Sequence, residues 1–369
     1  MKQKPIVLQV VEAFGGGVYH STLHACKPLE KDFDFVVLYS RRPETPDTFV
    51  QDFPVGTRFI EWRARRDISP KNDWAAMQDL RRIVAEVQPV CVHAHSSKAG
   101  ALARIAKFVD VLVGGAFKDI PLYYSPRAYG FLQQTENPIK RMIFLGAEVA
   151  LGVLPHTTVA CGAGELNMAR WIAPLQRKIA IYNSLNLREL DDVTRNVEKH
   201  ETFTVVGAGR ISPQKNFPLF VALAKELESE GVNFVWVGHG DGVAVGTLPA
   251  NLRLTGWVDQ TTCLRELAAG HVYVQTSLWE GLPRTVIEAM ALSLPVVVSN
   301  VSGNRELVEQ ERDGYVCADK MAFVEAILTL KTREAQRLRM GRAARAKVEH
   351  DYSDVATKKA WKDLYSGKA

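Results

Sequence analysis

The chain has 369 residues, of which 47% are hydrophobic and 24% are charged. This balance is typical of a folded globular protein and excludes a disordered or fibrous chain. The length exceeds one ordinary hydrophobic core and predicts two α/β domains.

Positive charge is concentrated in the first half of the chain. Residues 1–185 carry 23 Lys and Arg against 17 Asp and Glu, whereas residues 186–369 carry 23 against 24. The excess gathers at Arg41, Arg42, Arg58, Arg63, Arg65, Arg66, Lys140 and Arg141. A solvated basic face is one interpretation, and an anionic partner such as a phosphorylated lipid or a membrane surface is the other. We expect no nucleic-acid partner, because no aromatic residues interleave the arginines.

Cysteine usage and apolar runs indicate the compartment. The five cysteines lie far apart without a C-x-x-C pair, which predicts neither a disulfide framework nor a zinc site. A membrane-spanning helix needs about 18 apolar residues, and the nearest candidate, Met142 to Leu154, is interrupted by Glu148. We therefore expect a cytoplasmic protein, with peripheral binding to the inner face of the cell membrane as the alternative.

In the first half, short apolar runs alternate with amphipathic stretches, which predicts a parallel sheet covered by helices. The predicted strands are Ile6–Val11, Phe35–Tyr39, Val90–Ala94, Leu122–Ser125, Thr157–Ala160 and Ile179–Tyr182. The predicted helices are Val18–Leu29, Asp73–Val87, Ala99–Lys107, Pro138–Leu151 and Glu165–Trp171. The polar stretch from Asn183 to Glu201 is interpreted as a linker.

The alternation of predicted strands and helices begins again in the second half of the chain. The predicted strands are Thr204–Ala208, Phe234–Val237, Leu252–Leu254, Val272–Gln275 and Val296–Ser299. The predicted helices are Phe217–Glu228, Thr261–Ala269, Thr285–Leu292, Met321–Leu330, Glu334–Val348 and Ser353–Tyr365. We expect an N-terminal domain over 1–185, a second domain over 186–350, and a C-terminal helix within 351–369 that packs back on the first. Two doubly wound domains predict a cleft, with binding at the carboxyl ends of the strands.

Two cations follow the first strand of the second domain. Arg210 and Lys215 lie between this strand and the helix that begins near Phe217. The positive N-terminal end of a helix favours anions, so these cations are not there for the helix. Two positive charges beside free backbone N–H groups fit a diphosphate. Two exposed loop cations are the alternative.

Two glutamates eight positions apart form the second constellation. Glu280 follows a strand, and Pro283 suits the first turn of the next helix. Glu288 lies one turn further, among the apolar residues of a stretch that includes Ile287 and Met290. A carboxylate in such surroundings needs a specific partner, and a vicinal diol supplies two hydroxyl donors.

These features resemble the donor domain of the GT-B glycosyltransferases, and specifically of glycosyltransferase family 4. The residues that carry the resemblance are Arg210 and Lys215, Gly238-His-Gly240-Asp241, Leu254-Thr-Gly256-Trp-Val258, Glu280-x7-Glu288 and Pro295-Val-Val-Val-Ser299. The ordered set covers essentially all of residues 200–350. The resemblance implies an α/β chain of GT-B architecture, with two Rossmann-like doubly wound parallel-sheet domains facing a cleft.

The resemblance also implies roles for the donor residues. Arg210 and Lys215 would bind the donor phosphates, and Glu288 would hold the ribose hydroxyls. Glu280 would hold the transferred sugar. The remaining implied contacts are the backbone near Val258 with the nucleobase, and the amides of Leu282, Arg284 and Thr285 with the terminal phosphate and sugar.

The N-terminal half resembles the same family more loosely. Three glycines, Gly15 to Gly17, match the turn whose amides approach the donor or acceptor, with Gly16 and Gly17 implied on the donor side. Acceptor contact is implied for His20, His95, Ser96 and Lys98. His93 and His95 lie on one strand face, but no third ligand follows, so a metal site is disfavoured.

One position departs from the family. Members place a catalytically important histidine after the next strand, and the corresponding stretch of this sequence reads Tyr124-Ser-Pro-Arg127. Arg127 can donate hydrogen bonds to a sugar or to the reacting oxygens, but it cannot act as a base at neutral pH. We include Arg127 with Arg210, Lys215 and Glu280 in the predicted catalytic set.

The implied reaction is sugar transfer from a nucleotide-sugar to a hydroxyl of a glycan or lipid-linked acceptor, with retention of anomeric configuration. Bacterial surface-polysaccharide synthesis is the family-based expectation. We expect no metal or other cofactor: Asp32-Phe-Asp34 matches a D-x-D pattern but lies at a strand entry. The alternatives are a non-catalytic nucleotide-sugar-binding subunit and an epimerase or hydrolase of the same fold.

Overall fold

The computed structural model describes residues 4–65, 67–134, 136–240 and 247–368, so Arg66 and Asp241 lie outside the described residues. The chain forms two compact units. Unit 1 comprises Met1–Leu132, Glu136–Asn183 and Thr357–Ala369, and unit 2 comprises Gln133–Thr135 and Ser184–Ala356. Among the described residues, no helix has both the length and the apolar character that crossing a membrane requires.

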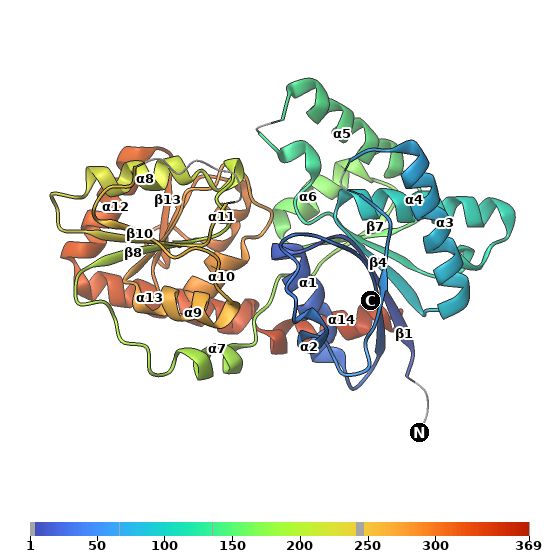
Figure 1. Ribbon diagram of the computed structural model, residues 1–369, viewed down its shortest axis with the longest axis horizontal. Coiled ribbons are helices and arrows are strands. Elements are labelled where there is room, and N and C mark those ends of the chain that lie inside the picture. Colours follow the sequence, from blue (N-terminus) through green and yellow to red (C-terminus); the bar gives the residue numbers. More distant parts are fainter. Residues whose placement is uncertain (1–3, 66, 135, 241–246, 369) are drawn as a thin grey trace. The chain divides into compact units, whose positions relative to one another are not determined.

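Unit 1 is built on a seven-stranded parallel sheet in the order β3-β2-β1-β4-β5-β6-β7 (Figure 1). Its strands are β1 (Ile6–Phe14), β2 (Asp34–Arg41), β3 (Arg58–Glu61), β4 (Cys91–His95), β5 (Leu122–Ser125), β6 (Thr157–Ala160) and β7 (Arg177–Ala180). The chain order reverses between β1 and β4, which are hydrogen-bonded neighbours. Loops that leave the carboxyl ends of two such strands diverge and open a binding crevice.

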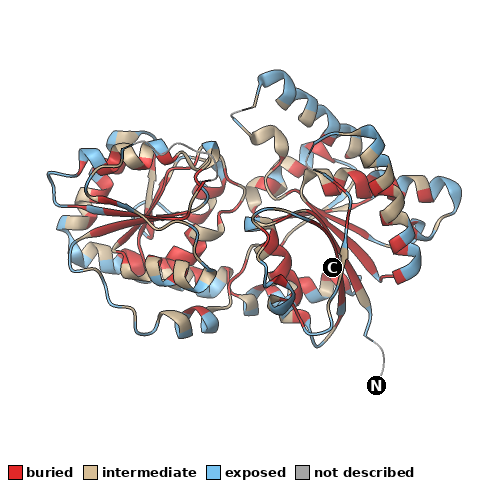
Figure 2. Cartoon of the chain, in the orientation of Figure 1, coloured by how far each residue is buried: buried red, intermediate tan, exposed pale blue. Residues whose placement is uncertain are grey.

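Helices flank this sheet (Figure 1). They are α1 (Gly16–Cys26), α2 (Phe49–Asp52), α3 (Pro70–Val87), α4 (Ser97–Val113), α5 (Pro138–Leu151), α6 (Ala163–Ile172) and α14 (Asp354–Tyr365). Three short 3-10 helices lie at Lys27–Leu29, Ala116–Lys118 and Gly130–Leu132. The inner strands β1, β2, β4, β5 and β6 are mostly buried, as expected for a parallel sheet covered on both faces, whereas the edge strands β3 and β7 are partly exposed (Figure 2).

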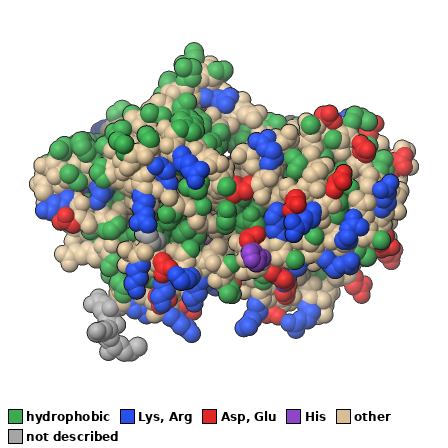
Figure 3. Space-filling model, turned by 180° about the vertical axis from the view of Figure 1, so that it is seen from behind, with side chains coloured by type: hydrophobic (Ala, Val, Ile, Leu, Met, Phe, Trp, Pro, Cys, Tyr) green, Lys and Arg blue, Asp and Glu red, His purple; other side chains and the backbone are tan. Residues whose placement is uncertain are grey.

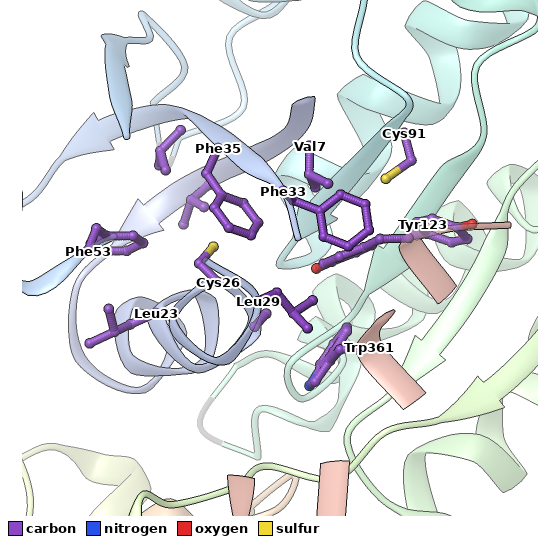
Figure 4. Close-up of a cluster of buried hydrophobic side chains, with 14 of the residues drawn as sticks. Val7, Leu23, Cys26, Leu29, Phe33, Phe35, Phe53, Cys91, Tyr123 and Trp361 are labelled. Carbon is purple, nitrogen blue, oxygen red and sulfur yellow. The ribbon is translucent and has the colours of Figure 1, made fainter. Parts of the chain in front are cut away.

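The C-terminal helix α14 belongs to unit 1 from Thr357 onward. Trp361 packs into a core cluster with Phe33 and Leu29 (Figure 4). The Tyr123 hydroxyl donates to the Leu364 carbonyl at 2.7 Å, which fixes the helix end against β5. The last residues of the chain are thereby part of the first fold unit.

Unit 2 repeats the design with six parallel strands in the order β10-β9-β8-β11-β12-β13. The strands are β8 (Thr204–Ala208), β9 (Asn233–Val237), β10 (Leu252–Leu254), β11 (Val272–Gln275), β12 (Val296–Ser299) and β13 (Gly314–Cys317). The helices are α7 (Leu187–Thr194), α8 (Phe217–Glu226), α9 (Gln260–Ala269), α10 (Arg284–Ala291), α11 (Ser302–Leu307), α12 (Lys320–Thr332) and α13 (Glu334–Asp351). Here the order reverses between β8 and β11. The expected α/β class with two Rossmann-like parallel-sheet domains is confirmed.

The predicted linker is where the structure differs most from the sequence prediction. Residues Leu187–Thr194 form α7, which begins after Asn186, whose side chain accepts from the Glu189 N–H. The main segment of unit 2 runs from Ser184 to Ala356. The Leu185 N–H donates to the Tyr352 carbonyl at 2.9 Å, which ties this residue to the end of α13.

Candidate active site

Lys215 and Glu280 form an ion pair at the point where the strand order of unit 2 reverses. Lys215 follows β8 and Glu280 follows β11, and these strands are neighbours. Lys215 Nζ donates to Glu280 Oε1 at 2.7 Å, with 17% and 8% of the two side chains exposed. Ser277 Oγ donates to the same oxygen at 2.7 Å. The sequence-predicted cation and carboxylate are therefore in direct contact.

Hydrogen bonds join the two loops that carry this pair. Thr276 Oγ1 donates to the carbonyls of Lys215, at 2.8 Å, and Asn216, at 3.1 Å. The Leu278 N–H donates to the Gln214 carbonyl at 2.8 Å. Asn216 has a φ of +49°, so it turns the chain into α8 through the left-handed region that Asn tolerates. This bonding preorganises both charges before a ligand arrives.

Arg210 lies on an exposed turn beside the loop that follows β9. A hydrogen bond holds this turn in place: Trp236 Nε1 donates to the Gly209 carbonyl at 2.9 Å. Gly238 approaches the same carbonyl so closely that a Cβ atom would lie 2.3 Å from its oxygen, and its φ is +134°. The glycines thus hold two loops close together, and exposed Arg210 directly follows Gly209.

The N-terminus of α10 lies in the same crevice. Pro283 is the N-cap, one position before the predicted first turn, and no side chain caps this helix end. The first N–H groups, those of Arg284 and Thr285, therefore form a positive helix end suited to a phosphate. Thr285 Oγ1 accepts from the Tyr273 hydroxyl at 2.9 Å, which anchors the turn to β11.

Glu288 lies one turn into α10 and is almost fully buried, with 2% of the residue exposed. Gln260 Nε2 and Arg284 Nε both donate to its Oε1, each at 2.9 Å. Burial raises its pKa, which the charge of Arg284, the hydrogen bond from Gln260 and the charge of Lys215 partly offset. Among the described residues no donor reaches Oε2, so one carboxylate oxygen remains for a ligand hydroxyl.

Val258 and Leu282 are the other two residues of unit 2 that were predicted to contact the nucleotide-sugar donor. Val258 is half-buried and follows the bridge in which Gly256 pairs with Gly238, beside the β9 loop. Leu282 is buried, with 5% exposed, immediately before the α10 N-cap. Unit 2 therefore gathers its predicted donor residues at one edge of its sheet.

In unit 1, the predicted glycines lie at the β1 and β4 reversal. Gly15 caps α1, and Gly16 has a φ of +49°, which a side chain would strain. Gly16 and Gly17 are exposed, and a Cβ atom at either position would meet nothing within 4 Å. His20 lies on α1 in ring contact with Tyr19 at 5.2 Å. The backbone of this glycine turn is therefore exposed at the carboxyl edge of the sheet.

His95 ends β4, and the structure does not support its predicted direct contact with an acceptor. No part of it is exposed. Its Nε2 lies 2.7 Å from Gln9 Oε1, and its Nδ1 lies 3.4 Å from Arg127 Nη2. Burial lowers its pKa well below the usual value, with His93 and Arg127 adding to the effect. His95 is a neutral support for Arg127.

Arg127 follows β5 in a strained backbone conformation. Its φ is +57° and that of Ala128 is +73°, two successive non-glycine residues in the left-handed region. Buried Glu165 holds this turn, because Oε1 accepts from the Ala128 N–H at 2.9 Å and Oε2 from the Cys161 N–H at 2.8 Å. Arg127 Nη1 donates to Asn183 Oδ1 at 3.1 Å. Strain kept by a dedicated clamp is typical of functional sites.

The α4 N-terminus completes this edge. Ser96 is the N-cap, with a φ of +79°, and its Oγ and that of Ser97 are buried without a hydrogen-bond partner in the described structure. Lys98 points elsewhere: its Nζ donates to Asp73 at 2.5 Å and to the Asp67 carbonyl at 3.1 Å. Its contact with an acceptor stays a prediction, and in this structure its charge is paired with Asp73 of α3.

A separate cavity of about 400 Å³ lies at the opposite edge of the unit 1 sheet. Pro5, Val90 and Pro121, the residues just before β1, β4 and β5, line it. Open parallel sheets bind ligands at the carboxyl ends of their strands, so this cavity is not the candidate site.

Several residues of the two sites were not predicted from the sequence. They are Gln214, Gln260 and Ser277 in unit 2, and Gln9, Asn183, Glu165 and Tyr365 in unit 1. Gln9 had a usable signal, since it interrupts an otherwise apolar strand. Among the described residues, no cluster of potential metal ligands occurs.

Residues 202–333 match the family model for glycosyl transferases group 1. A UDP-Gal:alpha-D-GlcNAc-diphosphoundecaprenol alpha-1,3-galactosyltransferase from Escherichia coli is 25% identical over 326 residues, covering 81% of both chains. Sucrose-phosphate synthase from Thermosynechococcus elongatus superposes with a TM-score of 0.80 at 16% identity, covering 99% of this chain and 100% of that one.

A second solved structure carries a donor. Anabaena Alr3699/HepE in complex with UDP-glucose superposes with a TM-score of 0.78 at 16% identity, covering 98% of this chain and 100% of that chain. The matched family segment contains every residue of the crevice at β8 and β11. Residues 202–333 therefore match the family model for glycosyl transferases group 1, and the chain is a glycosyltransferase with the GT-B fold.

Proposed function

We propose that unit 2 holds a nucleotide-sugar and unit 1 an acceptor hydroxyl, and that the sugar moves between them with retention of anomeric configuration, as in glycosyltransferase family 4. The Lys215–Glu280 pair at the strand-order reversal carries this proposal. A cation placed for the diphosphate, beside a carboxylate placed for the sugar, matches the two parts of such a donor. Support also comes from the acceptor in the Escherichia coli relative's name, a lipid-linked diphosphate.

The chemistry needs stabilisation of the departing nucleoside diphosphate. As the bond between the anomeric carbon and the phosphate oxygen breaks, negative charge grows on that oxygen. Arg210, Lys215 and the N-terminus of α10 supply positive charge on preorganised loops, which is the efficient form of electrostatic catalysis. Glu280 then accepts hydrogen bonds from the sugar once Lys215 turns to the phosphate.

Donor labelling tests the function. The full chain is incubated with radiolabelled UDP- and GDP-sugars, with and without a lipid-linked oligosaccharide fraction. Acceptor-dependent label transfer with release of nucleoside diphosphate is the expected result, and the anomeric coupling constant of the product reports retention. Free sugar would instead indicate a hydrolase, an altered donor an epimerase, and no turnover with any donor a non-catalytic subunit.

Turnover is expected to survive excess EDTA, because two cations and a helix N-terminus supply the charge that a divalent metal supplies elsewhere. The measurement is the initial rate of the same assay before and after chelation. Recovery of a lost rate by added Mg²⁺ or Mn²⁺ would contradict the metal-free proposal.

Glu288→Gln is expected to weaken nucleotide-sugar binding by about 10- to 100-fold, because ribose hydroxyls donate poorly to an amide that also presents N–H groups. Isothermal titration with the donor found in the screen measures the change. The control is Glu226→Gln, an exposed carboxylate on α8. Equal donor affinity of the Glu288 variant and the wild type would remove the ribose assignment.

Helix α5 supplies a surface for the acceptor's membrane. Glu148 is its only buried residue: Arg104 Nη2 donates to it at 2.9 Å, and the Tyr124 hydroxyl at 2.7 Å. The helix turns apolar side chains outward instead, with Ile139, Met142 and Ile143 at 68%, 72% and 60% exposure (Figure 3, top). Lys140 lies among them. Lys140 pairs with Glu136 at 2.8 Å, so the exposed apolar residues are what fits this face to a bilayer surface.

The arginines of 41–66 fit this role less well than expected from the sequence. Arg41, Arg42 and Arg63 pair with Asp47, Glu12 and Asp79, respectively. Each of these three cations has a carboxylate partner within unit 1, and among the described residues no exposed apolar run accompanies them as it does on α5. We therefore assign the membrane surface to α5 rather than to the arginine-rich segment.

The variant Ile139→Ser/Met142→Ser/Ile143→Ser is expected to lose most binding to phosphatidylglycerol-containing vesicles, at least about tenfold, because three interfacial anchors are removed. Cosedimentation measures it. The matched control, Met321→Ser/Leu338→Ser/Val355→Ser, changes equally exposed apolar residues of unit 2. Equal sedimentation of both triple variants would contradict the α5 surface.

A further inference from the structure

A buried chain of polar side chains leads from Arg127 to the C-terminal helix. Arg127 Nη2 lies 3.4 Å from His95 Nδ1, and His95 Nε2 lies 2.7 Å from Gln9 Oε1. Gln9 Nε2 then lies 3.0 Å from Tyr365 Oη on α14. Gln9 and His95 have no exposed surface, and Tyr365 has 2%.

The chain continues from Tyr365 to the backbone of β6. Tyr365 Oη lies 2.8 Å from His93 Nδ1, and His93 Nε2 lies 2.9 Å from Ser125 Oγ. Ser125 Oγ lies 2.8 Å from the Val159 carbonyl oxygen. His93 and Ser125 also have no exposed surface. The chain is closed to water over this length and ends on a fixed acceptor.

The Val159 carbonyl sets the direction of every hydrogen bond. A carbonyl only accepts, so the one Ser125 hydroxyl proton points to it, and Ser125 Oγ must accept from His93 Nε2. Burial lowers the pKa of His93 well below its usual value, so the ring is neutral. Its Nδ1 then has no proton and accepts from the Tyr365 hydroxyl.

The same reasoning fixes the other half. The Tyr365 proton is committed, so its oxygen accepts from Gln9 Nε2, and Gln9 Oε1 is left to accept from His95 Nε2. His95 is neutral as well, so its bare Nδ1 faces Arg127, whose guanidinium can only donate. Each link of the chain thus joins one donor to one acceptor, with no conflict between neighbouring links.

We propose that Tyr365 is a positioning residue: through Gln9 and His95 it fixes the lone pair that holds the Arg127 guanidinium at the carboxyl end of β5. The inference rests on the proposed role of Arg127 in sugar transfer. Without the Tyr365 hydroxyl, Gln9 Nε2 loses its acceptor and the amide is free to turn over. His95 then gains access to the other tautomer, whose Nδ1–H points at the guanidinium and opposes it.

The kinetic test is a double-mutant cycle of Tyr365→Phe and Arg127→Lys. Tyr365→Phe alone is expected to lower kcat about tenfold with the KM for donor unchanged. In the Arg127→Lys background the same change is expected to have no further effect, because the group it positions is gone. The control is Tyr123→Phe, which removes a buried hydroxyl bonded to the same helix but outside the chain.

Selective ¹⁵N-histidine NMR gives a second readout that needs no turnover. The wild type is expected to show His93 and His95 as neutral rings protonated on Nε2, and Tyr365→Phe is expected to lose the single tautomer at His95. Protonation of His95 on Nδ1 in the wild type would overturn the inference. So would equal kcat losses in the Tyr365 and Tyr123 variants, or additive losses in the cycle. Full activity of Arg127→Lys would instead overturn the proposed role of Arg127, a failure that the NMR result separates from failure of the chain.

Discussion

Replacing Lys215 with alanine is expected to lower kcat/KM for sugar transfer by about 10³-fold, the effect of removing one preorganised charge from a developing anion. Lys215 is held at 2.7 Å from Glu280 on a loop that Thr276 fastens to β11. Its charge therefore already lies in the crevice, and only its side chain has to turn from Glu280 to the departing diphosphate. The measurement is the initial rate with labelled donor under saturating acceptor.

The control tests whether the loss of activity depends on a positive charge at the site or on the loss of any lysine charge. Lys225→Ala removes an exposed cation from α8 and is expected to leave kcat/KM within about twofold. Lys215→Arg keeps the positive charge and is expected to retain more activity than the alanine variant. Because Lys215→Ala leaves Glu280 without its cation, thermal unfolding must be followed in parallel. A Lys215→Ala enzyme as active as Lys225→Ala would contradict the phosphate role.

Much of the unit 2 site follows from the sequence, because its parts interrupt regular patterns. Arg210 and Lys215 are charged residues in the short segment between a strand and a helix. Glu288 is a charged residue in an otherwise apolar stretch of a helix. The residues that bond to them do not interrupt a regular pattern, so the sequence does not single them out. Gln260 lies 28 residues before Glu288 and meets it only because α9 packs beside α10.

The elements missed by the sequence prediction are short and atypical. β3 spans only Arg58–Glu61 at a sheet edge, with a charged residue at each end, so it lacks the long apolar run of a central strand. β13 spans Gly314–Cys317 and begins with a residue that disfavours strands. α7 carried a readable signal, since Asn186 followed three positions later by Glu189 is a capping pattern.

The unit 1 site depends on contacts that no local pattern can predict. Gln9 and Tyr365 are separated by 356 positions and meet only after α14 has packed on the first sheet. The two histidines are visible in the sequence, but their role reverses once burial is known. A strand-end histidine that looks available for a ligand is in fact enclosed, and its hydrogen bonds support Arg127. The sequence identifies residues at this edge of the sheet but not the hydrogen bonds that connect them.

Arg127→Lys is expected to lower kcat by about 10²-fold while nucleotide binding, measured by titration with the free nucleoside diphosphate, stays within about twofold. The guanidinium bonds Asn183 through Nη1 and His95 through Nη2, and one ammonium group cannot reproduce this fork. The matched control is Arg177→Lys, an exposed arginine on β7, which is expected to leave kcat unchanged. If Arg127→Lys and Arg177→Lys were equally active, the guanidinium would have no part in transfer, and the strained turn clamped by Glu165 would serve stability alone.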